Sequence, residues 1–86
     1  MNSWEVAKRL ANSINTYITL GYHVTNIQGI QILSLVVDQE RERILYQTDV
    51  SDYLLYNKEY ERNNILDLFN ANIRIYRRVE LDGTHY

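Results

Sequence analysis

The sequence predicts a small single α+β domain: an antiparallel sheet of three to four strands with two helices, in the order helix, strand, strand, strand, helix, strand. Three observations predict it. Apolar residues near the N-terminus recur at helical spacing, the middle of the chain holds a dense aliphatic run, and residues 73–81 alternate between apolar and polar. The length of 86 residues fits one domain over 1–86, and we expect residues 82–86 to form a frayed end.

The first predicted helix covers Trp4–Leu20, and Gly21 after it can adopt the left-handed conformation that ends helices. A short edge strand, Tyr22–Gln28, is predicted next, with Gly29 as the turn into the following strand. The apolar face of the helix consists of Val6, Ala7, Leu10, Ala11, Ile14, Tyr17 and Ile18.

Two central strands, Ile30–Asp38 and Arg43–Thr48, are predicted around a charged turn. Both carry apolar residues on both faces. In the first strand Leu33, Leu35 and Val37 oppose Ile30, Ile32 and Val36, and in the second Ile44 and Tyr46 oppose Leu45. A sheet that is apolar on both faces needs cover on both. Either the two helices lie on opposite faces, or a second molecule covers one of them, and the sequence leaves both arrangements open.

Helical structure is predicted over Ser51–Asn70, with a break at Asn57-Lys58 as the alternative. On one continuous helix Tyr53, Tyr56 and Tyr60 would share a face, because they are related as i, i+3 and i+7. We predict that this tyrosine ladder contacts a binding partner. The alternatives are that the ladder packs on the sheet, or that the tyrosines lie on separate elements.

The last predicted strand is Ile73–Leu81, which has an apolar face and a polar face. Arg74, Tyr76 and Arg78 fall on the polar face and are predicted to contact a partner. This strand can pair with the strand at Tyr22–Gln28 or with Arg43–Thr48, and the sequence does not choose between them.

Composition argues against several kinds of chemistry. The chain has no Cys, two His and three widely separated Gly, so disulfides, thiolate metal sites, zinc-type spacings and phosphate-binding Gly loops are not expected. We therefore expect no catalytic residues, no metal and no cofactor. The N-terminus lacks the pattern of a signal peptide, and no stretch is long and apolar enough for a membrane span. We expect a cytoplasmic protein without membrane contact.

The function favoured by these features is that of a small, non-catalytic protein-binding module, acting as a homodimer on a protein partner. Eight Tyr residues support this hypothesis, because Tyr combines a large contact area with a polar tip. Small chains without Cys or Pro also occur among accessory proteins of phages and other viruses. The sequence therefore favours a viral accessory protein that binds, and inhibits or modulates, a host protein in the host cytoplasm.

The alternative is a single-stranded nucleic-acid-binding or DNA-binding regulatory protein. Tyr76 would stack on a base while Arg74 and Arg78 neutralise phosphates, as on other sheet surfaces that bind single strands. The formal net charge of −2, from 9 basic and 11 acidic residues, argues against this alternative.

Overall fold

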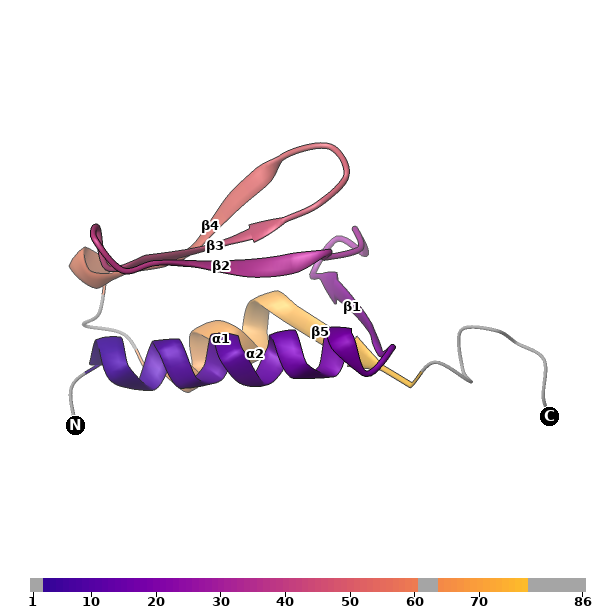
Figure 1. Ribbon diagram of the computed structural model, residues 1–86, viewed down its shortest axis with the longest axis horizontal. Coiled ribbons are helices and arrows are strands. Elements are labelled where there is room, and N and C mark those ends of the chain that lie inside the picture. Colours follow the sequence, from indigo (N-terminus) through magenta and orange to yellow (C-terminus); the bar gives the residue numbers. More distant parts are fainter. Residues whose placement is uncertain (1–2, 61–63, 78–86) are drawn as a thin grey trace, which may run out of the picture.

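The computed structural model describes residues 3–60 and 64–77. Their elements confirm the predicted α+β class, with two helices and antiparallel strands (Figure 1). In chain order they are α1 (Ser3–Thr19), β1 (His23–Asn26), β2 (Ser34–Asp38), β3 (Arg43–Gln47), β4 (Asp52–Asn57), the 3-10 turn η1 (Lys58–Tyr60), α2 (Ile65–Asn72) and β5 (Ile73–Tyr76). No helix within the described ranges is both long enough and apolar enough to cross a membrane.

The strands form two sheets instead of the single predicted one: β2-β3-β4 and the pair β1-β5. Figure 1 shows the three-stranded sheet as one layer and α1, α2 and β5 as the other. Both helices therefore lie on the same side of β2-β3-β4. Of the two arrangements that the sequence left open, the one with helices on opposite faces is not found.

Helix α1 packs its apolar face against this sheet. Trp4, Ala7, Ala11 and Ile14 are buried, at the three- and four-residue spacings that place side chains on one helical face. The two alanines have no exposed surface, and their small side chains let the helix backbone approach the strands closely. Gly21, two residues after the helix ends at Thr19, adopts the predicted left-handed conformation, with a φ of 96°.

The predicted strand Ile30–Asp38 is shorter in the structure and begins at Ser34. Residues 30–32 bind β1 instead: the amide of Asn26 donates to the carbonyl of Ile30 at 2.9 Å, and the amide of Ile32 donates to the carbonyl of Val24 at 2.7 Å. The Ile32 side chain is fully buried in the core. Residues 30–32 therefore connect the two sheets. The alternation of residue types within one strand does not predict such a connection.

The predicted helix over Ser51–Asn70 is wrong in its first part, because Asp52–Asn57 is strand β4, paired antiparallel with β3. The connecting turn is held by Thr48, whose hydroxyl donates to the carbonyl of Ser51 at 2.8 Å and accepts from the Ser51 amide at 3.1 Å. The register shifts near Ile44, and Leu55 and Tyr56, which follow each other in sequence, are both buried. This irregularity is a β-bulge, which turns two successive side chains inward.

Helix α2 begins after Asn64, whose side-chain oxygen accepts hydrogen bonds from the amides of Leu66 and Asp67. It leads directly into β5, which pairs antiparallel with β1. The sequence left two pairings open for this strand. The structure shows the pairing with β1, which is the strand that follows the first helix. The predicted extension of this strand to Leu81 includes residues 78–81, which lie outside the described residues.

Candidate functional site

The three predicted ladder tyrosines do not share a helix. Tyr53 and Tyr56 lie on β4, and Tyr60 ends η1, with its side chain outside the described part of the chain. Tyr56 has no exposed surface and stacks on Trp4, with ring centroids 6.0 Å apart. The structure therefore places Tyr56 in the core, away from any surface that a partner could contact.

Tyr53 is half-buried and stacks on Tyr46 of β3, with centroids 5.3 Å apart and an interplanar angle of 28°. The two residues are directly opposite each other in the ladder between β3 and β4. The Tyr46 hydroxyl accepts a hydrogen bond from the side-chain amide of Asn26 at 3.4 Å. This aromatic pair therefore connects the three-stranded sheet to β1 at the edge of the core.

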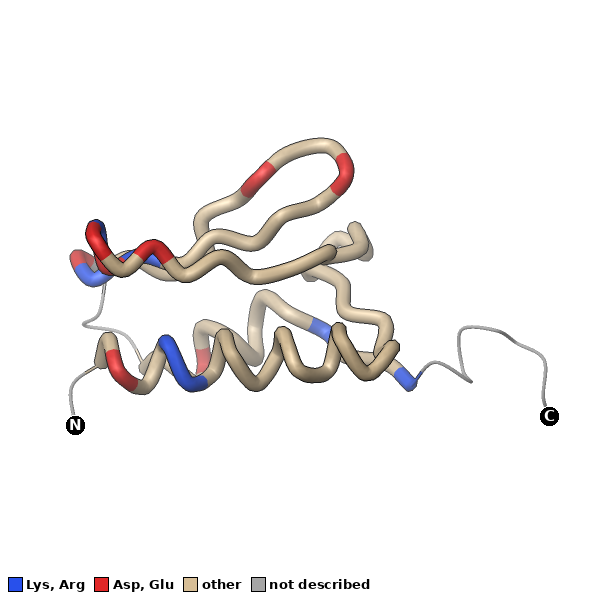
Figure 2. The backbone as a smooth tube through the Cα atoms, viewed as in Figure 1, with Lys and Arg blue, Asp and Glu red and all other residues tan. Residues whose placement is uncertain are grey.

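Arg74 and Tyr76 lie two residues apart on the same face of β5, and both are exposed as predicted. The predicted burial of the opposite face is found only at Ile73, because Ile75 is 39% exposed. Tyr76 is 41% exposed and lies beside His23 of β1, with ring centroids 6.4 Å apart. The Arg74 guanidinium donates to the carbonyl of Asn70 at 3.4 Å. Arg78, the third residue predicted here, lies outside the described residues. In Figure 2 the described chain at the β5 end carries blue segments, which mark basic residues, and no red segments, which mark acidic residues.

A further candidate surface is the side of β2-β3-β4 that faces away from the helices, which we call the outer face. Its middle row consists of Val36, Leu45 and Leu54, each directly opposite its neighbour across the ladder. Val36 is 37% exposed and Leu54 is 42% exposed. Polar rows lie on either side: Ser34, Gln47 and Asp52 toward one end of the strands, and Asp38, Arg43 and Asn57 toward the other.

The inner face of the same sheet differs sharply from the outer face. Leu35 and Ile44 are buried, while Val37 and Tyr46 are partly buried against the core. Neighbouring residues along a strand point to opposite faces of the sheet. Because these four side chains point inward, the side chains of Val36 and Leu45 point outward. Among the described residues, no element lies over the outer face in Figure 1. An apolar row is thus left at the surface between two polar rows.

The charged end of the outer face is organised around Asp38. One carboxylate oxygen of Asp38 lies 3.1 Å from Arg43 Nε and 3.2 Å from an Arg41 guanidinium nitrogen. The backbone N–H of Arg41 is the main cause that lowers the pKa of Asp38 below its ordinary value. The two guanidinium groups lower this pKa further, against partial burial, which raises it. Asp38 is therefore an ionised, hydrogen-bonded carboxylate at neutral pH.

The hairpin tip beyond Asp38 carries mixed charge rather than a patch of one sign (Figure 2). Lys58 pairs with Glu42 at 3.0 Å, and Lys8 of α1 reaches the side chain of Gln39 at 3.4 Å. Exposed ion pairs of this kind contribute little stability. We interpret the tip as a solvated turn. Because its charges are of both signs, it does not form a positive or negative patch that would attract a charged ligand.

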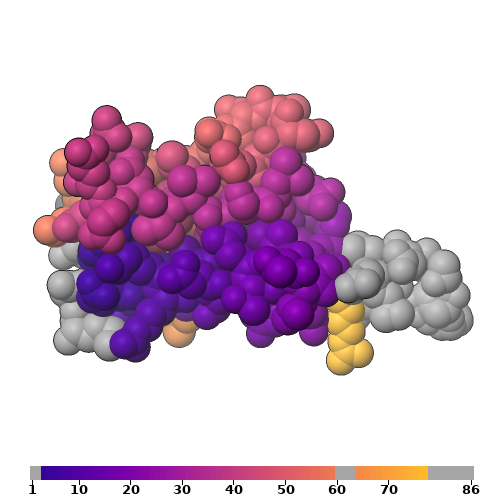
Figure 3. Space-filling view, viewed as in Figure 1, coloured from indigo at the N-terminus to yellow at the C-terminus, as the bar shows by residue number. Residues whose placement is uncertain are grey.

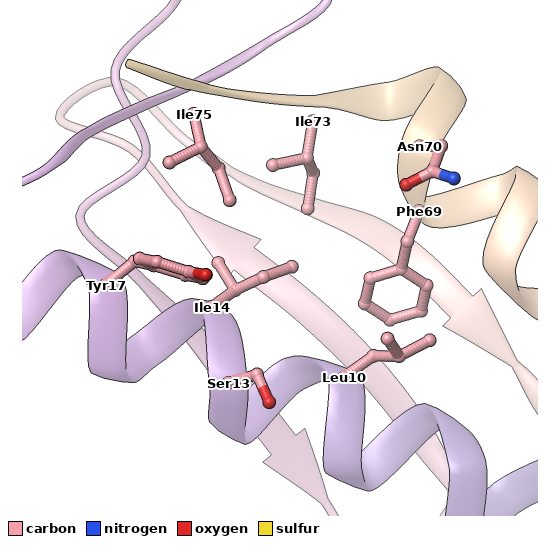
Figure 4. Close-up of a pocket in the computed structure, with 8 residues that line it drawn as sticks. All are labelled: Leu10, Ser13, Ile14, Tyr17, Phe69, Asn70, Ile73 and Ile75. Carbon is pink, nitrogen blue, oxygen red and sulfur yellow. The ribbon is translucent and has the colours of Figure 1, made fainter. Parts of the chain in front are cut away.

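A groove lies on the opposite side of the molecule, between α1 and the segment from α2 into β5. Figure 4 shows side chains of α1 directed toward those of α2 and β5 across it. Its volume is about 180 Å³, below the roughly 300–1,000 Å³ of typical small-molecule pockets. The groove is lined by Leu10, Ser13, Ile14, Tyr17, Phe69, Asn70, Ile73 and Ile75.

Within residues 3–60 and 64–77, no group of three or more His, Asp or Glu side chains is arranged to hold a metal ion. The polar side chains of the outer face are instead paired with one another. For example, the Ser34 hydroxyl donates to the side-chain oxygen of Gln47 at 2.6 Å. Such an arrangement suits contact with a complementary surface.

Sequence reasoning identified part of the outer face and missed the rest. The alternation along the two central strands already placed Val36 and Leu45 opposite the inward residues. Leu54 was missed because its segment was assigned to a helix. A run of Tyr, Leu, Leu and Tyr directly after a short polar turn was the available signal for a hairpin strand.

The chain was compared with models of protein families, with curated proteins and with solved structures, and none of these comparisons gives a match.

Proposed function

We propose that this protein is a small, non-catalytic protein-binding module that associates with itself through the outer face. The observation that carries the proposal is the row Val36, Leu45 and Leu54, which is apolar, continuous across three strands and bounded by polar rows. Protein interfaces commonly combine an apolar centre with a polar rim in this way.

The arrangement of the layers supports the same proposal. Both helices cover the inner face, so that face supplies the core of the single chain (Figure 1). Covering the apolar row on the other face would stabilise the complex, because removing apolar surface from water is favourable. In this proposal the resulting homodimer acts as an accessory module on a further protein, the role that the composition favours.

The test is the mass in solution by light scattering over a series of protein concentrations, at low and high salt. We expect a dimer at high concentration, with little weakening by salt, because the contact is mainly apolar. Leu54→Asp introduces a charge into the apolar row and should give a monomer. Leu66→Asp is the matched control, because Leu66 is similarly exposed but lies on α2.

Circular dichroism and thermal unfolding must show that both variants keep the fold. The proposal is contradicted by a wild-type protein that stays monomeric at every concentration. It is also contradicted if Leu54→Asp leaves the dimer intact, or if Leu66→Asp dissociates it equally well.

A second candidate function is binding of single-stranded nucleic acid by the exposed face of β5. It is favoured by one observation: Arg74 and Tyr76 lie side by side on this face, with Tyr76 exposed for stacking. Base stacking on an aromatic ring beside a cation is a common way to bind single strands. This surface is separate from the outer face, so the two functions can be tested independently.

A further inference from the structure

We infer that the edge of β5 away from β1 is a docking site for an extended peptide segment of a partner protein, in which acidic and apolar residues alternate. The segment adds to the pair β1-β5 as an antiparallel strand. It places an apolar side chain in the groove beside α1 and directs acidic side chains toward Arg74. This site is separate from the outer face and does not depend on self-association through it.

The direction of the backbone groups of β5 follows from the bonds that β1 makes on its far side. There the amide of Asn26 donates to the carbonyl of Ile30 at 2.9 Å. This amide cannot also donate to Ile73, its ladder partner, so Asn26 and Ile73 form a pair without hydrogen bonds. Bonded and non-bonded pairs alternate along an antiparallel ladder, so Val24 and Ile75 form a non-bonded pair as well. The backbone N–H and C=O of Ile75 therefore point away from β1.

Among the described residues, these groups of Ile75 have no hydrogen-bond partner, because β5 is the last strand of its sheet. The C=O of Ile73 lies on the same edge without a donor, whereas the N–H of Ile73 donates to the carbonyl of Phe69 in α2. Free N–H and C=O groups along an edge are a template for another extended chain. In Figure 3 the yellow end of the described chain projects beyond α1, so this edge is open to solvent.

The groove beside α1 gives the added segment a place for one apolar side chain. Residues opposite each other in a ladder project to the same face of the sheet, so the residue that pairs with Ile75 also projects toward α1. Figure 4 shows Ile75 and Tyr17 on opposite sides of this groove. An apolar cavity of roughly 150 Å³ holds a benzene-sized group. The groove volume of about 180 Å³ therefore has room for one large apolar side chain.

The two neighbours of that apolar residue project to the other face, beside Arg74 and Tyr76. Arg74 is exposed, and within residues 3–60 and 64–77 it forms no ion pair. Its guanidinium donates to a neutral group, the carbonyl of Asn70. Acidic side chains on the added segment are therefore complementary in charge to this face, and basic ones are repelled.

The unpaired edge favours a peptide over a single-stranded nucleic acid at this site. Stacking on Tyr76 and phosphate contacts with Arg74 would leave the backbone groups of Ile75 and the apolar groove without a partner. An added peptide strand satisfies both, because main-chain hydrogen bonds provide affinity and a pocket for alternate side chains provides specificity.

Strand β4 also lies at the edge of a sheet, but it is less suited to this role. Its ladder with β3 contains the β-bulge, and bulges twist an edge so that it pairs poorly with a further strand. Strand β5 pairs with β1 in continuous register over four residues, from Ile73 to Tyr76.

The probe is a capped, fluorescein-labelled heptapeptide in which Glu alternates with Val or Leu, and binding is followed by fluorescence anisotropy. We expect it to bind, and we expect the same peptide with Lys in place of Glu to bind at least about tenfold more weakly, because it brings like charges together. Failure of the Glu peptide to bind overturns the inference, as does equal binding of the Lys peptide.

Backbone methylation of the probe tests strand addition itself. In the antiparallel pairing the amides of the apolar residues point toward β5, and those of the Glu residues point away. Methylating the amides of the apolar residues should therefore abolish binding, while methylating those of the two inner Glu residues should leave it nearly unchanged. Equal effects of the two patterns would overturn the proposed pairing.

Two substitutions in the protein test the groove and the charge. Ser13→Trp fills the groove from an exposed position of α1 and should block binding, whereas Asn12→Trp, at the exposed neighbouring position outside the groove, is the matched control. Arg74→Glu should weaken binding of the Glu peptide and strengthen binding of the Lys peptide. Circular dichroism confirms that each variant is folded. Binding that survives Ser13→Trp, or that Arg74→Glu does not change, would overturn the inference.

Hydrogen exchange of the Ile75 amide locates the contact without any substitution. This amide should exchange rapidly in the free protein and slow down when the Glu peptide is added. If it is already protected in the free protein, another part of the chain or a second copy occupies the edge, and the inference is overturned.

Leu54→Asp separates this inference from the proposed self-association. It alters the outer face and should leave binding of the Glu peptide unchanged, whether or not the wild-type protein forms a dimer. Loss of peptide binding in folded Leu54→Asp would place the peptide on the outer face and overturn the inference. Binding of oligothymidine to β5 by a protein that does not bind the peptide would also overturn it, in favour of the nucleic-acid function.

Discussion

The side-chain amide of Asn15 binds both backbone polar groups of Leu35. The Asn15 Nδ2 donates to the Leu35 carbonyl oxygen at 2.8 Å, and the Leu35 N–H donates to Asn15 Oδ1, also at 2.8 Å. A side chain of α1 thus takes the position that a neighbouring strand would have beside β2. This contact closes part of the β2 edge, which lowers the tendency of the sheet to add a further strand there.

We predict that Asn15→Ala lowers the free energy of unfolding by about 1–3 kcal/mol, because it leaves two partly buried backbone groups without their partner. Urea unfolding followed by circular dichroism measures the change. Asn12→Ala, at an exposed position of the same helix, is the control and should change stability by less than about 0.5 kcal/mol. Equal effects of the two substitutions would contradict the role assigned to Asn15.

Tyr56 is predicted to be a core residue whose truncation costs more than that of Tyr53. Tyr56→Ala removes a fully buried ring that stacks on Trp4 and should lower the free energy of unfolding by about 3–5 kcal/mol. Tyr53→Ala should cost less, because its ring is partly exposed. Thermal unfolding of the two variants compares them.

If Tyr56→Ala does not fold, Tyr56→Leu retains part of the apolar volume and allows the same comparison. A Tyr56 variant with wild-type stability would contradict the β4 assignment, and would revive the helical interpretation of this segment.

Asp38 is predicted to make stability depend on pH in the acidic range. Its pKa in the folded protein is lowered, so its contribution is fully present above the unfolded-state value of about 3.9 and is lost as pH falls below it. The wild-type protein should therefore be more stable than Asp38→Asn at pH 6, and this difference should shrink by pH 3. Urea unfolding at both values tests it, and a difference that is independent of pH would contradict the prediction.

The second candidate function, binding of single-stranded nucleic acid, is predicted to require the face of β5 that carries Arg74 and Tyr76. With a fluorescent oligothymidine as probe, Arg74→Ala should weaken binding and lower the slope of log affinity against log salt by about 0.7 for each phosphate contact removed. Tyr76→Ala should weaken binding through lost stacking.

Arg9→Ala, at an exposed position of α1, is the matched control for the charge removed. Binding that is equally affected by Arg9→Ala, or unaffected by the β5 variants, would rule out this face as a nucleic-acid site.

The candidate site was predictable only in part, and its residues show why. Arg74 and Tyr76 share an exposed face because alternation along one strand depends only on local sequence. Val36 and Leu45 were likewise placed by alternation. Tyr56 could not be placed in the same way, since its burial depends on the bulge in β4 and on Trp4, which is 52 positions away.

By itself the sequence determined most of what local periodicity specifies: the first helix, predicted at Trp4–Leu20 and found at Ser3–Thr19, the hairpin of β2 and β3, and the later part of the second predicted helix, which is found as Ile65–Asn72. The tertiary structure alone decided that Asp52–Asn57 is a strand, that β5 pairs with β1 and that both helices lie on one side of β2-β3-β4. The physical reason is that backbone groups must find hydrogen-bond partners, and in a sheet those partners come from distant parts of the chain. The spacing of Tyr53 and Tyr56 suits a helix, but pairing with β3 and burial under α1 outweigh that local preference.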